Sequence, residues 1–428
     1  MDNGFDYRNC WYPIAFSRDI STASITPFSV YDENFILLRG NDDSLTCLRD
    51  KCPHRAAKLS TGRMGQGIIE CQYHGWQFDL NGKCLKIPQL EPHKEIPQRA
   101  CVDSFQVRVV QGLVWFWYGT PGQDSTDDIP AVPDLDRGDT YSVDYIVDLP
   151  YDQSYLIENV IDVAHIHIAH HGIRGGGNRE LALPLDFTIE QNSAKGIKAQ
   201  FRSIGLPENT TSPLKAALVE FVAPNLVHYT SEYKDVSLIS GLALYSLPLG
   251  QQRCRLLYRK YSNFFSGRER RKPRWLEHHN QNTILQQDMA IIIGQHETIE
   301  ASNLELNELW LPIKTSDQLV LAYRRWLDEH GGNMPFFRGY RTSYRTPQSR
   351  DSAYPSDAYQ IHTRHCRDCS NMHAGLVRLQ KSLTWVLVIL ALVAISVEPG
   401  ALKNTSLLVI VLSIAAMLGL SRFKKLFE

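Results

Sequence analysis

The segment CPHRAAKLSTGRMGQGIIECQYHGW, residues 52–76, decides the fold of the chain around it. It holds a Cys-x-His pair, Cys52 and His54, and a Cys-x-x-His pair, Cys71 and His74. Two thiolates can bind one iron and two imidazoles a second iron, which is the ligand set of a Rieske [2Fe–2S] cluster. We therefore predict two facing loops that hold such a cluster between them.

A zinc knuckle is the alternative for these four residues, since it also uses two cysteines and two histidines. A zinc knuckle would place one of the ligand pairs on a helix. Here both pairs lie in turns, where Pro53 stiffens the first loop and Gly75 lets the second backbone pass close to the cluster. The mixed order of Cys and His within each pair favours the Rieske cluster.

Length, charge and cysteine content limit the class of protein to which this chain can belong. The chain has 428 residues, enough for two domains and an appendage, and a formal net charge of −1, so nothing suggests a nucleic-acid partner. The N-terminus shows neither a signal segment nor a transit peptide, which indicates a bacterial product or a mature organellar protein. Five cysteines lie scattered without framework spacing, so we expect reduced thiols and a reducing compartment. They are Cys10, Cys47, Cys84, Cys101 and Cys254.

Residues 10–120 are predicted to form a small all-β Rieske domain, because apolar and polar residues alternate between turn signals. The acidic stretch 121–139, which carries prolines, is predicted to be a linker. Hairpin turns are expected at Gly40-Asn41-Asp42, at Asn81-Gly82 and at Gln111-Gly112.

Residues 140–345 are predicted to form a second domain of the α+β class. One helix is expected over residues 155–172, ended by Gly172, and another over about 275–300, with strand-like runs between them. Antiparallel strands with long helices favour a helix-grip-like plan, in which one sheet curls around a helix.

A second set of candidate ligands lies in the first of these helices. His165 and His170 can supply two ligands of a mononuclear non-haem iron, whose triad needs one carboxylate and leaves positions open for dioxygen and substrate. Asp162 lies three residues before His165, on the same predicted helical face, and suits orienting a histidine. We assign the missing carboxylate to Asp288, whose neighbours at apolar helical spacing predict an inward face.

Each of these residues also has a structural interpretation. A buried histidine commonly belongs to a core, and we interpret His167 and His171 in this way, or His171 as a helix cap. Asp288 could form an ordinary salt bridge, and the spacing of His165 and His170 alone does not decide between a core and a metal site. The predicted cluster favours the metal site, since a one-electron carrier needs an acceptor.

The segment IHTRHCRDCSNMH, residues 361–373, places Cys366-x-x-Cys369 beside His362 and His365. A zinc site, a redox pair and two unrelated thiols are all compatible with this pattern. The flanking arginines would stabilise thiolates, and we favour the redox pair.

Two apolar stretches without charge, residues 383–397 and 405–421, follow a predicted linker over 346–380. They predict a hairpin of two transmembrane helices over 383–421, against the alternative of a buried helical hairpin. Basic residues flank the hairpin, whereas its loop carries one charge of each sign. The positive-inside rule places the catalytic domains on the cytoplasmic or stromal side.

Taken together, the motifs resemble the Rieske non-haem iron oxygenases, and more closely their membrane-anchored, pheophorbide a oxygenase-like subfamily. The resemblance covers essentially the whole chain. Its motifs are CPHR at 52–55, CQYHGWQF at 71–78, IPQ at 87–89, QRACV at 98–102, GLVWFW at 112–117 and IENVIDVAHIHIAHHG at 157–172.

The resemblance implies a role for each candidate residue. The cysteines and histidines of segment 52–76 would bind the [2Fe–2S] cluster, and His165, His170 and Asp288 would bind the mononuclear non-haem Fe(II). Asp162 would connect a cluster histidine of a neighbouring subunit to an iron-ligand histidine, which implies a homotrimer. The Cys-x-x-Cys pair would be regulated by a thioredoxin.

The expected activity is that of a membrane-anchored monooxygenase. It would take electrons from ferredoxin or a similar reductase and use dioxygen on an amphipathic tetrapyrrole. The membrane would be a cyanobacterial thylakoid or plasma membrane, or a plastid membrane. Oxygenolytic ring opening of pheophorbide a is the lead expectation. Oxidation of a chlorophyllide or protochlorophyllide methyl group, hydroxylation of a chlorophyll catabolite, and a redox-sensing membrane subunit without turnover are the alternatives.

Overall fold

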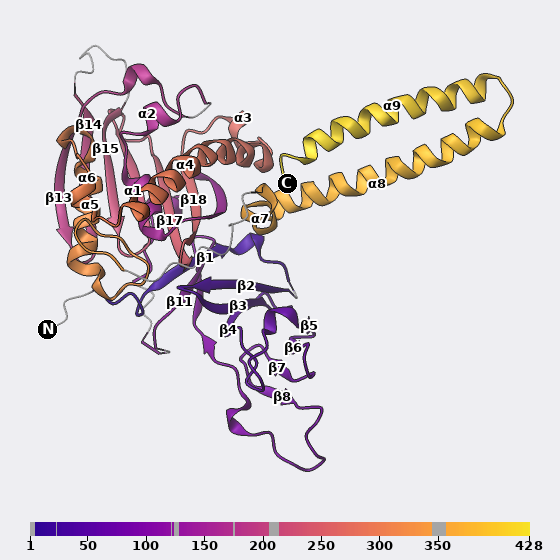
Figure 1. Ribbon diagram of the computed structural model, residues 1–428, viewed down its shortest axis with the longest axis horizontal. Coiled ribbons are helices and arrows are strands. Elements are labelled where there is room, and N and C mark those ends of the chain that lie inside the picture. The colour runs from indigo at the N-terminus through magenta and orange to yellow at the C-terminus, as the bar shows by residue number, and fades with distance from the viewer. Residues whose placement is uncertain are drawn as a thin grey trace. The chain divides into compact units, whose positions relative to one another are not determined.

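The computed structural model describes residues 5–22, 24–120, 122–123, 128–173, 176–204, 214–344 and 357–428, without the side chains of residues 214 and 215. The chain divides into two compact units, residues 1–271 with 283–352 and residues 272–282 with 353–428 (Figure 1). Parts of the predicted linkers 121–139 and 346–380 lie outside the described residues.

Short antiparallel strands form the N-terminal part of the first unit, drawn in indigo and purple in Figure 1. Their apolar side chains meet in an aromatic core, where the ring of Phe35 lies 5.0 Å from Phe105 and 4.7 Å from Phe116. The predicted turns join β3 to β4, β7 to β8 and β10 to β11. The strands are β1 (Trp11–Phe16), β2 (Ile25–Val30), β3 (Glu33–Arg39), β4 (Leu45–Arg49), β5 (Arg63–Gly65), β6 (Ile68–Glu70), β7 (Gln77–Asp79), β8 (Cys84–Lys86), β9 (Ser104–Phe105), β10 (Val107–Val110) and β11 (Leu113–Trp117).

A larger antiparallel sheet, in the order β12-β18-β17-β16-β15-β14-β13, forms the rest of the first unit. Helix α1 contacts β16, β17 and β18, and α6 packs on β13 and β14, with Leu319, Tyr323 and Trp326 among its buried side chains. The predicted α+β class is confirmed. The strands are β12 (Tyr141–Leu149), β13 (Leu185–Ser193), β14 (Gly196–Ser203), β15 (Leu214–Val222), β16 (Leu226–Tyr233), β17 (Ser240–Gly250) and β18 (Arg253–Ser262). The helices are α1 (Gln153–Ile161), α2 (Ile166–Ala169), α3 (Gly267–Arg270), α4 (Arg274–Ser302), α5 (Leu306–Leu309) and α6 (Lys314–His330).

Two buried arginines of β18 connect this sheet to the N-terminal strands. Each arginine lies directly opposite an aspartate of β12 and binds it through two nitrogens; the pairs are Asp144–Arg259 and Asp148–Arg255. Arg259 Nη1 also donates to Gln111 O (2.5 Å), and Arg255 Nη1 donates to Ile14 O (3.1 Å). Since each buried charge is paired and hydrogen-bonded, the two sheets are joined by oriented bonds.

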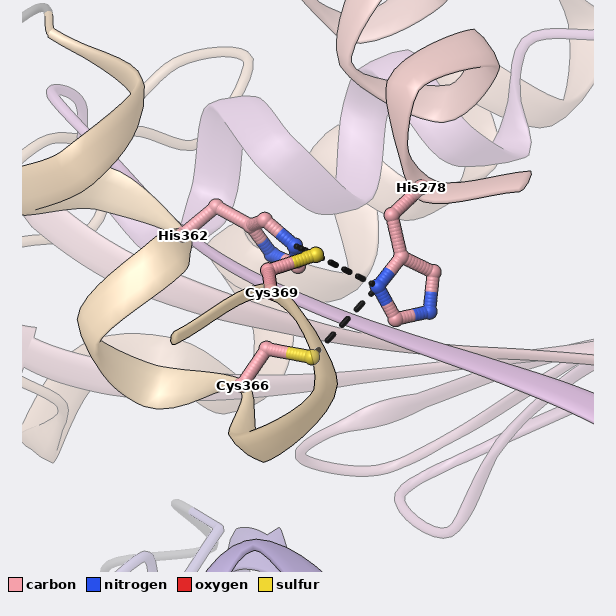
Figure 2. Close-up of side chains that lie close together, drawn as sticks. All are labelled: His278, His362, Cys366 and Cys369. Atoms are coloured by element: carbon pink, nitrogen blue, oxygen red, sulfur yellow. Dashed lines mark hydrogen bonds between the residues drawn. The ribbon is translucent and has the colours of Figure 1, made fainter. Parts of the chain in front are cut away.

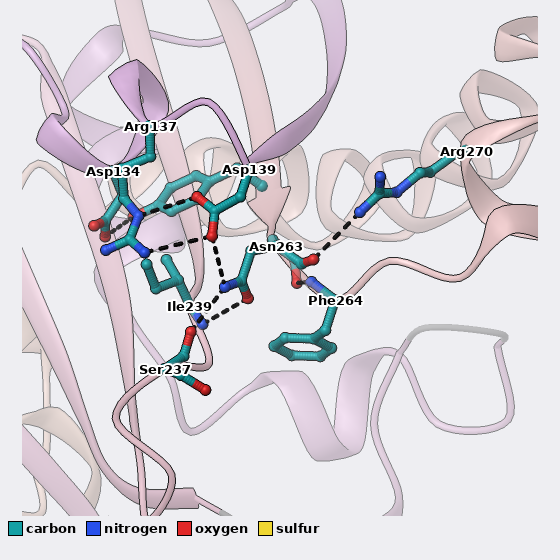
Figure 3. Close-up of polar contacts among 10 residues, drawn as sticks. Asp134, Arg137, Asp139, Ser237, Ile239, Asn263, Phe264 and Arg270 are labelled. Carbon is teal, nitrogen blue, oxygen red and sulfur yellow. Dashed lines mark hydrogen bonds and ion pairs between the residues drawn. The ribbon is translucent and has the colours of Figure 1, made fainter.

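A polar network holds the chain where it enters β12 (Figure 3). Asp139 accepts hydrogen bonds from Arg137 (3.2 Å) and from Asn263 Nδ2 (3.3 Å). Asn263 Nδ2 also donates to Ser237 O (2.8 Å), and its Oδ1 accepts from Ile239 N (2.9 Å). One asparagine after β18 therefore ties the predicted linker to the loop before β17.

The second unit contains two long apolar helices, which lie side by side as a hairpin (Figure 1). Both are long and apolar enough to cross a membrane, and their large side chains are exposed, with Trp385 at 69% and Ile395 at 81%. Exposure of this kind is contrary to a buried helical hairpin and fits a membrane anchor. The helices of this unit, besides the start of α4, are α7 (Ala358–Ile361), α8 (Arg367–Ser396) and α9 (Ala401–Lys424).

Candidate iron–sulfur and mononuclear iron sites

The two loops of segment 52–76 have the same backbone turn. Ala56 N donates to Cys52 O (3.0 Å), and Gly75 N donates to Cys71 O (2.9 Å). Ala56 and Gly75 both have positive φ, of 58° and 71°. The left-handed residue four positions after each cysteine reverses the chain and returns it toward that cysteine. The sequence predicted a close approach of the backbone to the cluster at Gly75, and it gave no sign that an alanine would have a left-handed conformation in the first loop.

The side chains of these loops are arranged by type. Cys52 and Cys71 are buried next to each other, and burial raises the pKa of Cys52 to about 11. The rings of His54 and His74 lie 4.6 Å apart, and Trp76 stacks on His54. Nδ1 of His74 is buried and has no hydrogen-bond partner among the described residues. Paired thiols, paired imidazoles and an unsatisfied ring nitrogen fit a Rieske cluster.

The helix predicted over residues 155–172 is wrong as a single element. Helix α1 ends at Ile161, and α2 begins only at Ile166. Oδ1 of Asp162 accepts a hydrogen bond from Ala164 N (2.8 Å), so this side chain takes a backbone amide that a continuous helix would use. Asp162 and His165 are therefore neighbours across a turn and do not share a helical face.

His165, His170 and Asp288 come together in the first unit. Oδ1 of Asp288 lies 3.2 Å from His170 Nε2 and 3.8 Å from His165 Nε2, and the three ligand atoms are within 4.8 Å of one another. Asp288 is only 4% exposed, and its Oδ1 is a buried atom without a hydrogen-bond partner in the described part of the chain. A buried carboxylate facing two ring nitrogens is the donor set of a mononuclear non-haem iron.

The other ring nitrogens determine which way the imidazoles face. Nδ1 of His170 lies 3.1 Å from Gln287 Oε1, and Nδ1 of His165 faces Asp162 Oδ2 at 3.5 Å. An acceptor beside Nδ1 favours the tautomer that has its hydrogen there, and this leaves the lone pair of Nε2 directed at Asp288. Gln287, adjacent to the carboxylate in sequence, was not among the predicted site residues.

His167 and His171 support the loop after α2. Nδ1 of His167 accepts from Asn178 N (3.3 Å), and Nδ1 of His171 accepts from Arg179 N (3.1 Å). The loop returns close to α2 at Gly176, where an added Cβ would lie 2.3 Å from His170 O. Both histidines thus have structural contacts, and a glycine lets the loop pass over the backbone of a candidate ligand.

Comparison with known proteins gives the family. Residues 10–106 match the family model of the Rieske [2Fe-2S] domain, and residues 221–305, which include Asp288, match that of pheophorbide a oxygenase. Protein TIC 55 of Arabidopsis thaliana is 31% identical, over 92% of this chain and 77% of its own length. Pheophorbide a oxygenase of the same plant is 30% identical, over 91% of this chain and 77% of its own length.

The chain belongs to the pheophorbide a oxygenase-like Rieske oxygenases. It is thus a non-haem iron oxygenase with a Rieske [2Fe–2S] cluster and a mononuclear iron. Dicamba monooxygenase has the same fold, with a TM-score of 0.62 and 19% identity over 75% of this chain and 96% of that one. The two helices of the apolar hairpin are long and apolar enough to cross a membrane, which fits a membrane anchor in this Rieske oxygenase.

A cavity of about 530 Å³ adjoins the candidate iron site of this Rieske oxygenase. His165, Asp288 and Asp162 lie on its lining, and Gln295 adds an amide. Glu158, Asn159 and Asp317 are further polar residues of the lining, and its apolar residues are Ile291, Ile292, Leu309, Trp310, Leu311, Pro312 and Val320. A polar end beside the ligands and an apolar body suit a largely apolar organic substrate.

The cysteine pair of the tail lies in the second unit. Cys366 and Cys369 are buried, no disulfide joins any of the nine cysteines, and His362 lies with the pair while His365 does not. His278 of α4 completes the group. No sequence pattern pointed to His278, because it is distant from the pair along the chain.

Proposed function

We propose that this Rieske oxygenase acts on a chlorophyll-derived tetrapyrrole taken from a membrane, and that oxygenolytic ring opening of pheophorbide a is its reaction. The observation that carries the proposal is the cavity beside His165 and Asp288, since its apolar walls suit a large, flat, mainly apolar molecule. The match of residues 221–305 to the pheophorbide a oxygenase family supports the same substrate class.

Each residue of the site has a definable part in this reaction. When bound, the cluster supplies single electrons and the mononuclear iron activates dioxygen. His165, His170 and Asp288 would hold the iron, while Asp162 and Gln287 keep the two rings turned toward it. The apolar residues of the cavity would contact the substrate beside the iron.

The test is single turnover with a panel of pigments. The full chain in detergent is reduced anaerobically with ferredoxin, mixed with labelled dioxygen and one tetrapyrrole, and the products are analysed by mass. We expect labelled oxygen in the opened ring of pheophorbide a. Labelled oxygen on the methyl group of a chlorophyllide or protochlorophyllide, or in a hydroxylated catabolite, would show that this pigment is the substrate in place of pheophorbide a. No labelled oxygen in any tetrapyrrole would contradict the substrate class.

A redox-sensing subunit without turnover is the alternative from another class. It needs the cluster but has no need of His165, His170 and Asp288 around a cation. Iron analysis separates the two, since the oxygenase should contain about three irons per chain and a sensor about two.

Replacing Asp162 by asparagine should reduce iron occupancy and turnover by about 10–100-fold. The oxygen of the new side chain can still accept from Ala164 N, so the turn is kept. Its amide nitrogen, however, would donate toward His165 Nδ1 and favour the wrong ring tautomer. Iron content and turnover are measured together, and the cluster spectrum should be unchanged. Full activity would show that the Asp162 charge does not position His165.

We further propose a homotrimer in which electrons cross from the cluster of one chain to the iron of the next. Asp162 is the proposed link, since its side chain is part-exposed and faces His165. A Cys71→Ser chain would lack the cluster and an Asp288→Ala chain would lack the iron. Co-expressed, the two inactive chains should recover measurable turnover, about a quarter of wild type if they mix at random in pairs of neighbours. No recovery in mixed oligomers would show that electrons stay within one chain.

The other proposed partners are those expected for this family. Ferredoxin or a similar reductase is the proposed donor, and a thioredoxin could act on Cys366 and Cys369 only if these thiols form a disulfide. The proposed location is a plastid membrane or a cyanobacterial thylakoid or plasma membrane, with the catalytic domains on the stromal or cytoplasmic side. Support comes from the basic residues that flank the hairpin. Protease digestion of sealed vesicles of known orientation tests the side.

A further inference from the structure

We propose that His278, His362, Cys366 and Cys369 bind one structural zinc ion. All four residues belong to the second unit, and each is buried, with exposures of 1–2%. They come from three elements: His278 from α4, His362 from the end of α7, and the cysteines from the start of α8 (Figure 2). Two thiols and two imidazoles converging at one buried point are a closed ligand set of the kind that structural zinc sites use.

The distances match one tetrahedral ion. Nδ1 of His278 lies 3.4 Å from both sulfur atoms, and Nε2 of His362 lies 3.2 Å from Cys369 Sγ. Zinc bonds of about 2.3 Å to sulfur and about 2.0 Å to nitrogen place the sulfur and nitrogen corners of a tetrahedron about 3.5 Å apart. All four ligand atoms are within 4.8 Å of one another.

One ring hydrogen does not account for the position of His278. A ring nitrogen has at most one hydrogen, yet Nδ1 of His278 faces two sulfur atoms at equal distance. One cation bound by the two sulfur atoms and by Nδ1 of His278 would explain why both distances are equal. The cysteines are also placed to be thiolates, because Cys366 is the N-cap of α8 and Cys369 lies in its first turn, where the helix dipole favours negative charge.

The arrangement differs from that of an iron–sulfur cluster. At segment 52–76 the thiols lie together and the imidazoles lie together, which suits two irons. In the tail group each sulfur has a ring nitrogen as its neighbour, which suits one ion. Among the described residues only this group and the His165, His170 and Asp288 group bring three or more such ligand atoms within 4.8 Å.

The burial of the two cysteines also favours a zinc site over a redox pair. A catalytic or regulatory thiol must be reached by another protein, so reactive cysteines are usually part-exposed. Cys366 and Cys369 are 1% and 2% exposed. A metal holds such thiols as thiolates without any exchange with a partner.

Zinc analysis of the purified full chain in detergent tests the proposal. We expect about one zinc per chain beside about three irons, and X-ray absorption at the zinc edge should show two sulfur and two nitrogen ligands. Cys366→Ser and His278→Ala should each lower zinc to about a tenth or less, with the Rieske spectrum unchanged. His365→Ala is the matched control, since His365 is the neighbouring tail histidine outside the group, and it should retain zinc.

Two results would overturn the zinc site. One is a wild-type chain without zinc whose Cys366 and Cys369 are joined by a disulfide, as shown by peptide mass. The other is a fourth iron per chain with no zinc, which would assign the site to iron. If the variants fail to fold, the metal content and absorption edge of the wild-type chain decide alone. None of these measurements depends on which substrate the enzyme uses.

Discussion

Replacing Asp288 by alanine is expected to leave about two irons per chain and to reduce turnover by more than about 100-fold. The reason is that Asp288 supplies the carboxylate that faces His165 and His170, and the variant leaves two neutral imidazoles with no anionic ligand. Iron content, the absorption of the reduced cluster and single-turnover product are measured on the same sample. The cluster signal should equal that of the wild type.

The matched control is Glu297→Ala, which removes an exposed carboxylate from the same helix α4. It should keep about three irons and full turnover. If Asp288→Ala also keeps the mononuclear iron and its activity, the carboxylate ligand must come from another residue.

Replacing Arg324 by methionine is expected to destabilise the first unit by about 3–5 kcal/mol. Arg324 is fully buried, and its Nε donates to Glu158 Oε2 (2.5 Å) and its Nη1 to Arg338 O (2.5 Å). Without the guanidinium, Glu158 remains as a buried, uncompensated acid on α1. The measurement is denaturant or thermal unfolding in detergent, followed by a signal from the first unit.

The pH dependence of this variant has a definite sign. Burial already raises the pKa of Glu158, and losing Arg324 removes the main opposing interaction. The folded state would then bind a proton that the unfolded state releases, so the stability of the variant should fall as pH rises above the usual glutamic acid range. Arg325→Met, at an exposed position next in the chain, should be nearly neutral, and a second substitution, Glu158→Leu, should restore much of the loss. Equal unfolding of the Arg324 and Arg325 variants would contradict the buried pair.

Local chemistry explains how much of the molecule could be predicted. The cluster loops and the hairpin turns could be predicted from short motifs, since a Cys-x-His pair or an Asn-Gly turn needs only its immediate neighbours. Two long apolar stretches likewise predict membrane-spanning helices from their composition alone. The α+β class of the second domain followed from a run of strand-like segments between two predicted helices.

Long-range contacts explain what could not be predicted. His278 joins the tail cysteines from a helix far away in sequence, and the tail histidine at position 365, which lies closer to them along the chain, is not part of the group. The break after Ile161 was missed because periodicity treats Asp162 as a helical residue, whereas its side chain takes the amide of Ala164. Ala56 has a left-handed backbone that only the folded loop reveals.

The cavity walls suggest how this family can change its substrates. Leu309 is the last residue of α5, and Trp310, Leu311 and Pro312 lie in the short connection from α5 to α6, just beyond the segment 221–305. None of them is a candidate iron ligand or belongs to the cluster loops. Substitutions in this connection are therefore expected to change which substrates fit the pocket while the metal ligands stay in place. Variation among relatives at these positions would then change substrate choice and leave the metal centres unchanged.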